Sequence, residues 1–148
     1  MHDFIFRYQF LTIPFIAWFT AQALKFILDI MMSRQIDFRR LVGAGGMPSS
    51  HSTFVVSLST VIGVSEGLDS VAFGLAAAFA LVVMYDAAGV RRATGKQARV
   101  LNRLFYHDKE NFHLDEELKE LIGHTPVEVI AGALLGLAFG LLFMVVLI

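Results

Sequence analysis

The chain has 148 residues, of which 56% are hydrophobic and 17% charged, and its formal net charge is −1. Because it contains no cysteine, a disulfide scaffold, a zinc–cysteine module and a redox dithiol are excluded, and its hydrophobic share excludes a disordered chain. The weak net charge gives no general attraction for nucleic acid, and the length suits a single domain over residues 1–148, either in a membrane or as an unusually apolar soluble bundle.

The first long apolar segment covers residues 8–32. It is long enough for a membrane helix, which needs about 20 apolar residues, although Lys25 and Asp29 lie near its end. The small residues at 21–23 resemble the cleavage site of a signal peptide. However, the apolar region is too long for a signal peptide and only Arg7 precedes it as a basic residue, so we expect the segment to remain as a membrane helix.

Three further apolar segments follow, over residues 50–64, 71–90 and 126–148. The last two are long enough to cross a membrane, whereas the first is short and could be a tilted, re-entrant or protein-buried helix. Glycine and acidic residues between positions 63 and 69 predict a tight turn between the first two of these segments. No segment keeps the alternation of a β-strand. The predicted fold is therefore all-α, an integral membrane helical bundle with about four membrane helices.

Basic residues gather in residues 33–49 and 91–124, the two loops that four membrane helices place on the same side of the membrane. Every lysine and arginine lies in these loops except Arg7 and Lys25. By the positive-inside rule, we expect a multi-pass protein of the cell membrane in which both loops face the cytoplasm and both termini face outside.

The second basic loop also has the pattern of an amphipathic cytoplasmic helix. Its apolar residues recur at helical spacing among charged residues, at Val100, Leu101, Leu104 and Phe105. Such a helix either lies on the membrane surface or is solvated without contact to lipid, and both interpretations stay open.

The predicted topology brings the starts of the second and fourth membrane helices to the cytoplasmic face. Helix starts carry unpaired N–H groups and positive dipole ends, and the first and third helices end at the same face. The ends of those two helices carry four basic residues: Lys25, Arg34, Arg91 and Arg92. Positive helix ends beside basic side chains predict an anion site, and phosphate is the anion most often bound in this way.

Two motifs stand at these helix starts, G-A-G-G-M-P-S-S-H-S at residues 43–52 and G-H-T-P-V-E at residues 123–128. Glycines let a backbone approach a ligand, and hydroxyl groups donate hydrogen bonds to it. The candidate binding residues of the first motif are its glycines and serines: Gly45, Gly46, Ser49 and Ser50. His51 and His124 would flank the anion. Phosphoryl transfer through a phosphohistidine requires such a pair, because one imidazole attacks phosphorus and the other protonates the leaving oxygen.

Both motifs also have a purely structural interpretation. The serines could simply cap the second membrane helix. Thr125, Pro126 and Glu128 have the spacing of a capping box, in which Glu128 reaches back to the start of the helix. Capping could be the whole role of Glu128.

Three motifs, taken in order, resemble a known superfamily. P-S-S-H at residues 48–51 resembles the P-S-G-H motif of the type-2 phosphatidic acid phosphatase and vanadium haloperoxidase superfamily, and H-T-P-V-E-V-I-A-G at 124–132 is similar to its H-x-P-x-D-V-x-A-G stretch. The chain most resembles the small divergent membrane branch, which carries G-G-M-P-S-S-H-S, D-A-x-G-V-R-R and G-H-x-P-x-E-V. The middle motif stands here as D-A-A-G-V-R-R at 86–92, so the resemblance covers nearly the whole chain.

The resemblance implies a phosphoric ester hydrolase whose substrate is a phosphorylated lipid, either a phosphomonoester or a diphosphate. His124 would be the nucleophile, Glu128 would orient and polarise it, and His51 would be the general acid. Ser49 and nearby backbone amides would hold the phosphate oxygens. Neither a metal nor another cofactor is implied, and the sequence holds no metal motif such as H-E-x-x-H.

The chain departs from the superfamily pattern at several ligand positions. Ser50 replaces the glycine of the P-S-G-H motif. Lys25 and Arg34 lack the spacing and the following proline of another superfamily motif, K-x-x-x-x-x-x-R-P. Leu118 stands where an arginine is expected six positions before His124. Arg91 and Arg92 could serve as phosphate clamps in its place. These departures leave a second hypothesis open, namely a non-catalytic membrane protein that binds anionic lipid headgroups or scaffolds a partner.

Two further features have alternative interpretations. Asp86 lies near the end of an apolar segment, where acidic residues are rare and usually functional. It could position His51 or one of the arginines, or it could form a buried structural ion pair. Gly132 and Gly136 form a G-x-x-x-G pair, which permits close helix packing either within the chain or between two copies in a homodimer.

Overall fold

The computed structural model describes residues 7–33, 46–107, 118, 120 and 123–147. These residues form the helices α2 (Gln9–Ser33), α3 (Ser50–Glu66), α4 (Val71–Ala88), α5 (Val90–His107) and α6 (Pro126–Leu147), without a strand in these ranges. The all-α prediction is thus confirmed. The predicted binding residues Arg34 and Gly45 lie outside the described residues.

Three helical segments are long and apolar enough to cross a membrane: Gln9–Met31, Val71–Tyr106 and Pro126–Val146. Their outward surfaces are apolar, and large side chains such as Phe19, Leu75 and Val145 are exposed. Exposed apolar surface of this extent is unusual for a soluble monomer and is typical of helices that contact lipid. The protein is therefore a membrane protein.

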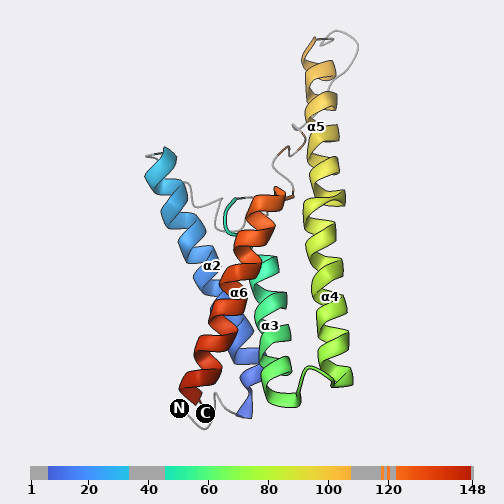
Figure 1. Ribbon diagram of the computed structural model, residues 1–148. Helices are drawn as coiled ribbons and strands as arrows, with labels where there is room; N and C mark the ends of the chain where they lie inside the picture. The colour runs from blue at the N-terminus through green and yellow to red at the C-terminus, as the bar shows by residue number, and fades with distance from the viewer. Residues whose placement is uncertain (1–6, 34–45, 108–117, 119, 121–122, 148) are drawn as a thin grey trace.

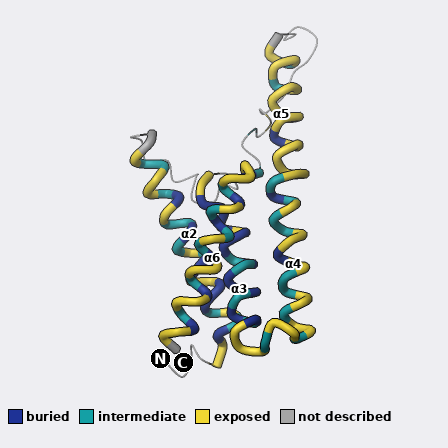
Figure 2. The backbone as a smooth tube through the Cα atoms, viewed as in Figure 1, coloured by how far each residue is buried: buried dark blue, intermediate teal, exposed yellow. Residues whose placement is uncertain are grey.

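The short helix α3 lies among the other helices and packs against α2, α4 and α6 (Figure 1). It has 17 residues and corresponds to the short apolar segment at residues 50–64, for which a tilted, a re-entrant and a protein-buried helix are the alternatives. Its buried positions are mostly hydroxyl residues and small residues: Ser50, Ser52, Thr53, Val55, Ser57, Ser59, Val61 and Gly63. Figure 2 shows the buried positions concentrated on this helix and on the sides of its neighbours that face it. The structure favours the protein-buried interpretation.

Glycines on α6 allow α3 to approach very closely. A Cβ atom at Gly132 would overlap the backbone carbonyl of Ser49, and one at Gly136 would crowd the backbone of Thr53. The Thr53 hydroxyl donates a hydrogen bond of 3.0 Å to the carbonyl of Gly132. The G-x-x-x-G pair therefore makes a contact within the chain. A homodimer stays a prediction that this pair does not support.

Helix α5 continues the direction of α4 and extends beyond the rest of the bundle (Figure 1). The backbone bond from the N–H of Ala93 to the carbonyl of Gly89, 2.9 Å long, carries the helical pattern across the junction. The combined segment Val71–Tyr106 has 36 residues, and at 1.5 Å per residue it is about 54 Å long. This exceeds a hydrocarbon core of about 30 Å, so part of the segment must leave the membrane. The direction of α5 favours the solvated interpretation of the amphipathic helix.

Alternate helices run in opposite directions, with α2 and α4 one way and α3 and α6 the other (Figure 1). The starts of α3 and α6 therefore lie at the end of the bundle where α2 and α4 finish. This arrangement brings together residues that are far apart in the sequence.

Candidate active site

His124 is fixed just before α6 by two backbone contacts. Its N–H donates a hydrogen bond of 3.0 Å to the carbonyl of Ala87 at the end of α4. The preceding Gly123 has a φ angle of +91° and lies so close to the backbone of Arg91 and Arg92 that a Cβ atom would overlap it. Only glycine suits such a position. The start of α6 is thus held against the end of α4.

Glu128 caps α6 and orients His124 with the same oxygen atom. Its Oε2 accepts a hydrogen bond of 3.1 Å from the N–H of Thr125 and lies 3.0 Å from Nδ1 of His124. The Thr125 hydroxyl in turn accepts a hydrogen bond of 3.3 Å from the N–H of Glu128, which completes the capping box. A carboxylate beside Nδ1 keeps the proton on that nitrogen and leaves the lone pair on Nε2.

The Nε2 atom of His124 is buried and has no hydrogen-bond partner among the described residues. The residue as a whole is 2% exposed. Burial lowers the pKa of His124, against the opposing effects of the Glu128 carboxylate and of the Gly46 backbone, and this direction favours the neutral imidazole. Buried polar atoms are rarely left without a partner. An unpaired, neutral Nε2 is the form of histidine that can act as a nucleophile.

His51, in the first turn of α3, lies beside His124. The centroids of the two imidazole rings are 6.4 Å apart, and the ring planes meet at 60°. Both rings line a pocket of about 290 Å³, hereafter the histidine pocket, together with Val82, Val83, Asp86, Ala87 and Arg91. Partial burial and the nearby positive charge of Arg91 lower the pKa of His51.

Asp86 and Arg91 form an ion pair at the edge of the histidine pocket. The Nε atom of Arg91 lies 2.9 Å from Oδ2 of Asp86, and the two side chains are 47% and 42% exposed. The pair is therefore not the buried structural ion pair of the second interpretation. A surface pair of this kind adds little stability, but it holds the guanidinium beside the two histidines.

Ser49 and Ser50 are buried and do not line the histidine pocket. Ser49 caps α3, and its hydroxyl accepts hydrogen bonds from the N–H and the hydroxyl of Ser52. Its own N–H donates a hydrogen bond of 3.0 Å to the carbonyl of Glu128. Ser49 thus fixes the start of α3 against α6, as the capping interpretation expects.

Lys25 reaches the site from α2. Its side chain is 6% exposed, and its Cδ atom lies against Gly46, which has a φ angle of +95°. Its positive charge lowers the pKa of both His51 and His124. Lys25 is therefore close enough to act on both histidines electrostatically.

Arg92 does not share the pocket of Arg91. It lines a second pocket of about 280 Å³, hereafter the basic pocket, on another side of His124. The lining consists of Gly46, Arg92, Gly95, Lys96, Arg99, Glu120, Gly123, His124, Thr125 and Glu128. Lys96 and Arg99 were not among the residues predicted to bind. Their spacing of four and seven from Arg92 places all three on one side of α5, and this signal could have found them.

No group of three or more His, Asp and Glu residues that could hold a metal ion occurs in the described parts of the chain.

Comparisons with known proteins found one matching family and one similar membrane protein. A sequence model of the family described as "Divergent PAP2 family" matches residues 6–139. The chain is also 41% identical to a Bacillus subtilis (strain 168) protein named "Uncharacterized membrane protein YuiD", and the alignment covers 79% of this chain and 82% of that protein. No solved structure matches.

Proposed function

The chain belongs to the divergent PAP2 family, and from this premise we propose that it is a membrane phosphatase that hydrolyses a phosphomonoester or diphosphate of a lipid. The observation that carries the proposal is the buried Nε2 atom of His124, which has no partner among the described residues and belongs to a side chain that lines a pocket with His51 and Arg91. These are a nucleophile, a proton carrier and a cation around one cavity.

In the proposed reaction, Nε2 of His124 attacks the phosphorus atom and the bond between phosphorus and the leaving oxygen breaks. Protonated His51 gives its proton to that oxygen. Neutral His51 then takes a proton from water, whose oxygen attacks the phosphohistidine and releases inorganic phosphate and His124. Glu128 holds Nδ1 throughout, and Arg91 stabilises the charge on the phosphoryl oxygens.

The proton on His51 depends on the substrate in this proposal. In the empty pocket, partial burial and the charge of Arg91 lower the pKa of His51, which opposes the role of a general acid. A bound phosphate brings negative charge next to the imidazole, and an opposite charge at this distance raises a histidine pKa. Substrate binding would therefore supply the protonated form that the first step needs.

An apolar pocket beside His51 supports a lipid as the substrate. Its volume is about 320 Å³, and it lies between α2, α3 and α4. The lining residues other than His51 are all apolar or aromatic: Phe15, Trp18, Phe54, Val55, Phe79 and Val83. His51 and Val83 line this pocket and the histidine pocket alike. A hydrocarbon chain in the apolar pocket would place its phosphate next to the two histidines.

The test uses the purified protein in detergent, with a chelator present. A phosphatidic acid, an isoprenyl diphosphate and a short-chain water-soluble phosphate ester are offered, and the release of inorganic phosphate is measured. We expect turnover of the long-chain substrates, a loss to background in His124→Ala, and a loss of roughly 10²- to 10⁴-fold in His51→Ala. His107→Ala is the matched control, because His107 lies at the end of α5. This variant should retain the activity.

Phosphate release that persists in His124→Ala would remove His124 as the nucleophile. Saturable phospholipid binding without turnover of any phosphate ester would instead favour the non-catalytic hypothesis.

We also propose that this site faces the cytoplasm of the cell membrane. The support is the positive-inside rule, because Arg91, Arg92 and Lys96 lie at the end of the bundle that carries His51 and His124.

A further inference from the structure

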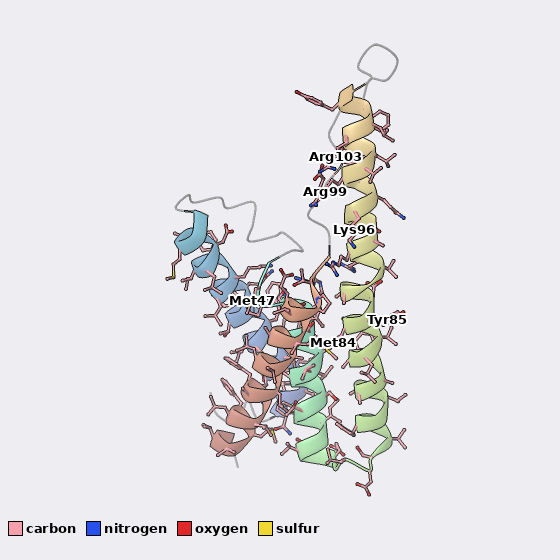
Figure 3. The ribbon with its side chains drawn as sticks, turned by 45° about the horizontal axis from the view of Figure 1, so that its top comes forward. Met47, Met84, Tyr85, Lys96, Arg99 and Arg103 are labelled. Atoms are coloured by element: carbon pink, nitrogen blue, oxygen red, sulfur yellow. The ribbon has the colours of Figure 1, made fainter. Side chains whose placement is uncertain are left out.

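The basic pocket has an excess of positive charge that the reaction at His124 does not use. Three cationic side chains of α5 line it, Arg92, Lys96 and Arg99, against the two carboxylates Glu120 and Glu128. Figure 3 shows Lys96 and Arg99 along the part of α5 that extends beyond the bundle. The charge of the lining therefore favours an anion.

Both carboxylates of the basic pocket are already engaged. Oε2 of Glu128 is held by Thr125 and His124. Glu120 receives a hydrogen bond of 3.2 Å from Nε of Arg99 and one of 3.0 Å from the amide of Asn102. In the described parts of the chain, no carboxylate forms an ion pair with Arg92 or Lys96. Among the described residues, these two are the cations of the pocket without a carboxylate partner.

The basic pocket is the last of three cavities in a series. The apolar pocket and the histidine pocket share His51, and the histidine pocket and the basic pocket share His124. A lipid that places its hydrocarbon chain in the first cavity and a phosphate in the second then has the third cavity next to the same histidine, His124. The three cavities thus have the order of the parts of a lipid diphosphate, which are a hydrocarbon chain, a first phosphate and a second phosphate.

We propose that the basic pocket is a second phosphate-binding subsite, in which Arg92 and Lys96 hold the phosphate group that lies further from the hydrocarbon chain. The substrate class that fits all three cavities is then a lipid with two linked phosphates. This inference rests on the proposed function, because it takes the histidine pocket as the place of the first phosphate. For such a substrate, Nε2 of His124 attacks the phosphorus in the histidine pocket, the bond from that phosphorus to the bridging oxygen breaks, and inorganic phosphate leaves from the basic pocket with the proton of His51. Water then releases the lipid monophosphate from His124.

The test measures binding without turnover, by calorimetric titration of the full chain in detergent. The probes are methylenediphosphonate, which carries two linked anionic groups that cannot be hydrolysed apart, and methylphosphonate, which carries one. Lys96→Gln removes one cation of the pocket. Arg103→Gln is the matched control, because Arg103 is a cation on α5 that does not line the pocket.

We expect Lys96→Gln to weaken the binding of methylenediphosphonate about 10-fold, the size of a lost charged hydrogen bond. The binding of methylphosphonate should change less than about 2-fold, since an exposed charge at a distance contributes little. Lys96→Arg should retain most of the affinity, and Arg103→Gln should leave both affinities as they are.

Three results would overturn the inference. One is an equal effect of Lys96→Gln on the two probes, or none on either. Another is an equal loss in Arg103→Gln, which would indicate general attraction to α5. The third is a second bound methylphosphonate that disappears in Lys96→Gln, because the pocket would then hold a separate phosphate, such as the headgroup of another lipid. If no lipid phosphate is hydrolysed, the proposed phosphatase function is wrong. The titration still decides separately whether the basic pocket binds a second phosphate.

Discussion

At the start of α6, one carboxylate oxygen joins the cap of the helix to the orientation of the candidate nucleophile. Thr125 and His124 precede Glu128 by three and four residues, the two spacings that lie on the same side of a helix. Oε2 of Glu128 can therefore reach both the N–H of Thr125 and Nδ1 of His124. This geometry fits both interpretations of Glu128, as the cap of α6 and as the residue that orients His124.

Glu128→Gln tests the orientation of His124 through its pH dependence. Burial lowers the pKa of His124, and the Glu128 carboxylate opposes this shift. Without that charge the pKa falls further, so the acidic limb of the kcat profile should move to lower pH. The value of kcat should fall by at least roughly 10-fold, as when other orienting partners of a histidine are removed. Glu66→Gln, at the far end of α3, is the control. If Glu128 only caps α6, the acidic limb of the kcat profile should stay at the same pH in Glu128→Gln.

The candidate site could be predicted from the sequence only in part. Helix direction and the two histidine motifs were enough to expect His51 and His124 near each other, and the rings lie 6.4 Å apart. The separation of Arg91 from Arg92 was also within reach, because consecutive residues of a helix point about 100° apart. The sequence did not indicate that the Ser49 hydroxyl accepts a hydrogen bond from Ser52. This hydrogen bond depends on which of several possible partners a hydroxyl meets once the helices are packed.

At the scale of the elements, the contact between α3 and α6 sets the position of both histidines. The N–H of Ser49 binds the carbonyl of Glu128, and Thr53 binds the carbonyl of Gly132. These bonds require the two backbones to approach more closely than side chains would allow. A glycine on α6 is therefore part of the geometry of the site.

Gly132→Ala should destabilise the bundle. The added methyl group would overlap the carbonyl of Ser49, and overpacking of this kind costs about 1–3 kcal/mol. Thermal unfolding in detergent should show a lower Tm. Gly74→Ala is the matched control, because a Cβ atom there meets nothing within 4 Å and alanine favours a helix by up to about 1 kcal/mol over glycine. Equal Tm values for the two variants would mean that α3 and α6 are not packed as described.

The sequence predicted the helices better than it predicted the relation between them. Hydropathy located the long apolar helices, and the pattern of Val100, Leu101, Leu104 and Phe105 indicated an amphipathic helix. The amphipathic pattern fits a helix on the membrane surface and a solvated helix equally, whereas in the structure the backbone bond from Ala93 to Gly89 continues α4 into α5. Whether a helix bends at a glycine depends on its surroundings, which a single sequence does not contain.

At the scale of the whole molecule, the combined length of α4 and α5 decides which parts lie outside the membrane. The segment Val71–Tyr106 has 36 residues, so roughly 24 Å of its length exceeds the hydrocarbon core. The apolar start of α4 suits the membrane, and the charged α5 suits water. The orientation proposed from the positive-inside rule would place α5 in the cytoplasm.

Cysteine labelling in intact cells tests this orientation, and the native chain gives no background because it has no cysteine. Leu68, in the turn between α3 and α4, is 74% exposed, and Val100 on α5 is 58% exposed. We expect Leu68→Cys to react with an impermeant maleimide in intact cells and Val100→Cys to react only after the cells are opened. The reverse pattern would place the histidines on the outer side.

In the proposed reaction, Nε2 of His124 forms a covalent bond to the phosphoryl group of the substrate. The most direct measurement is to quench the protein in alkali during turnover of a lipid phosphate and to locate the phosphorylated residue by mass spectrometry. We expect a phosphohistidine at His124 that builds up further in His51→Gln, because water is no longer activated, and that is absent in His124→Ala. Phosphorylation of another residue, or turnover with an intermediate that still forms in His124→Ala, would contradict it.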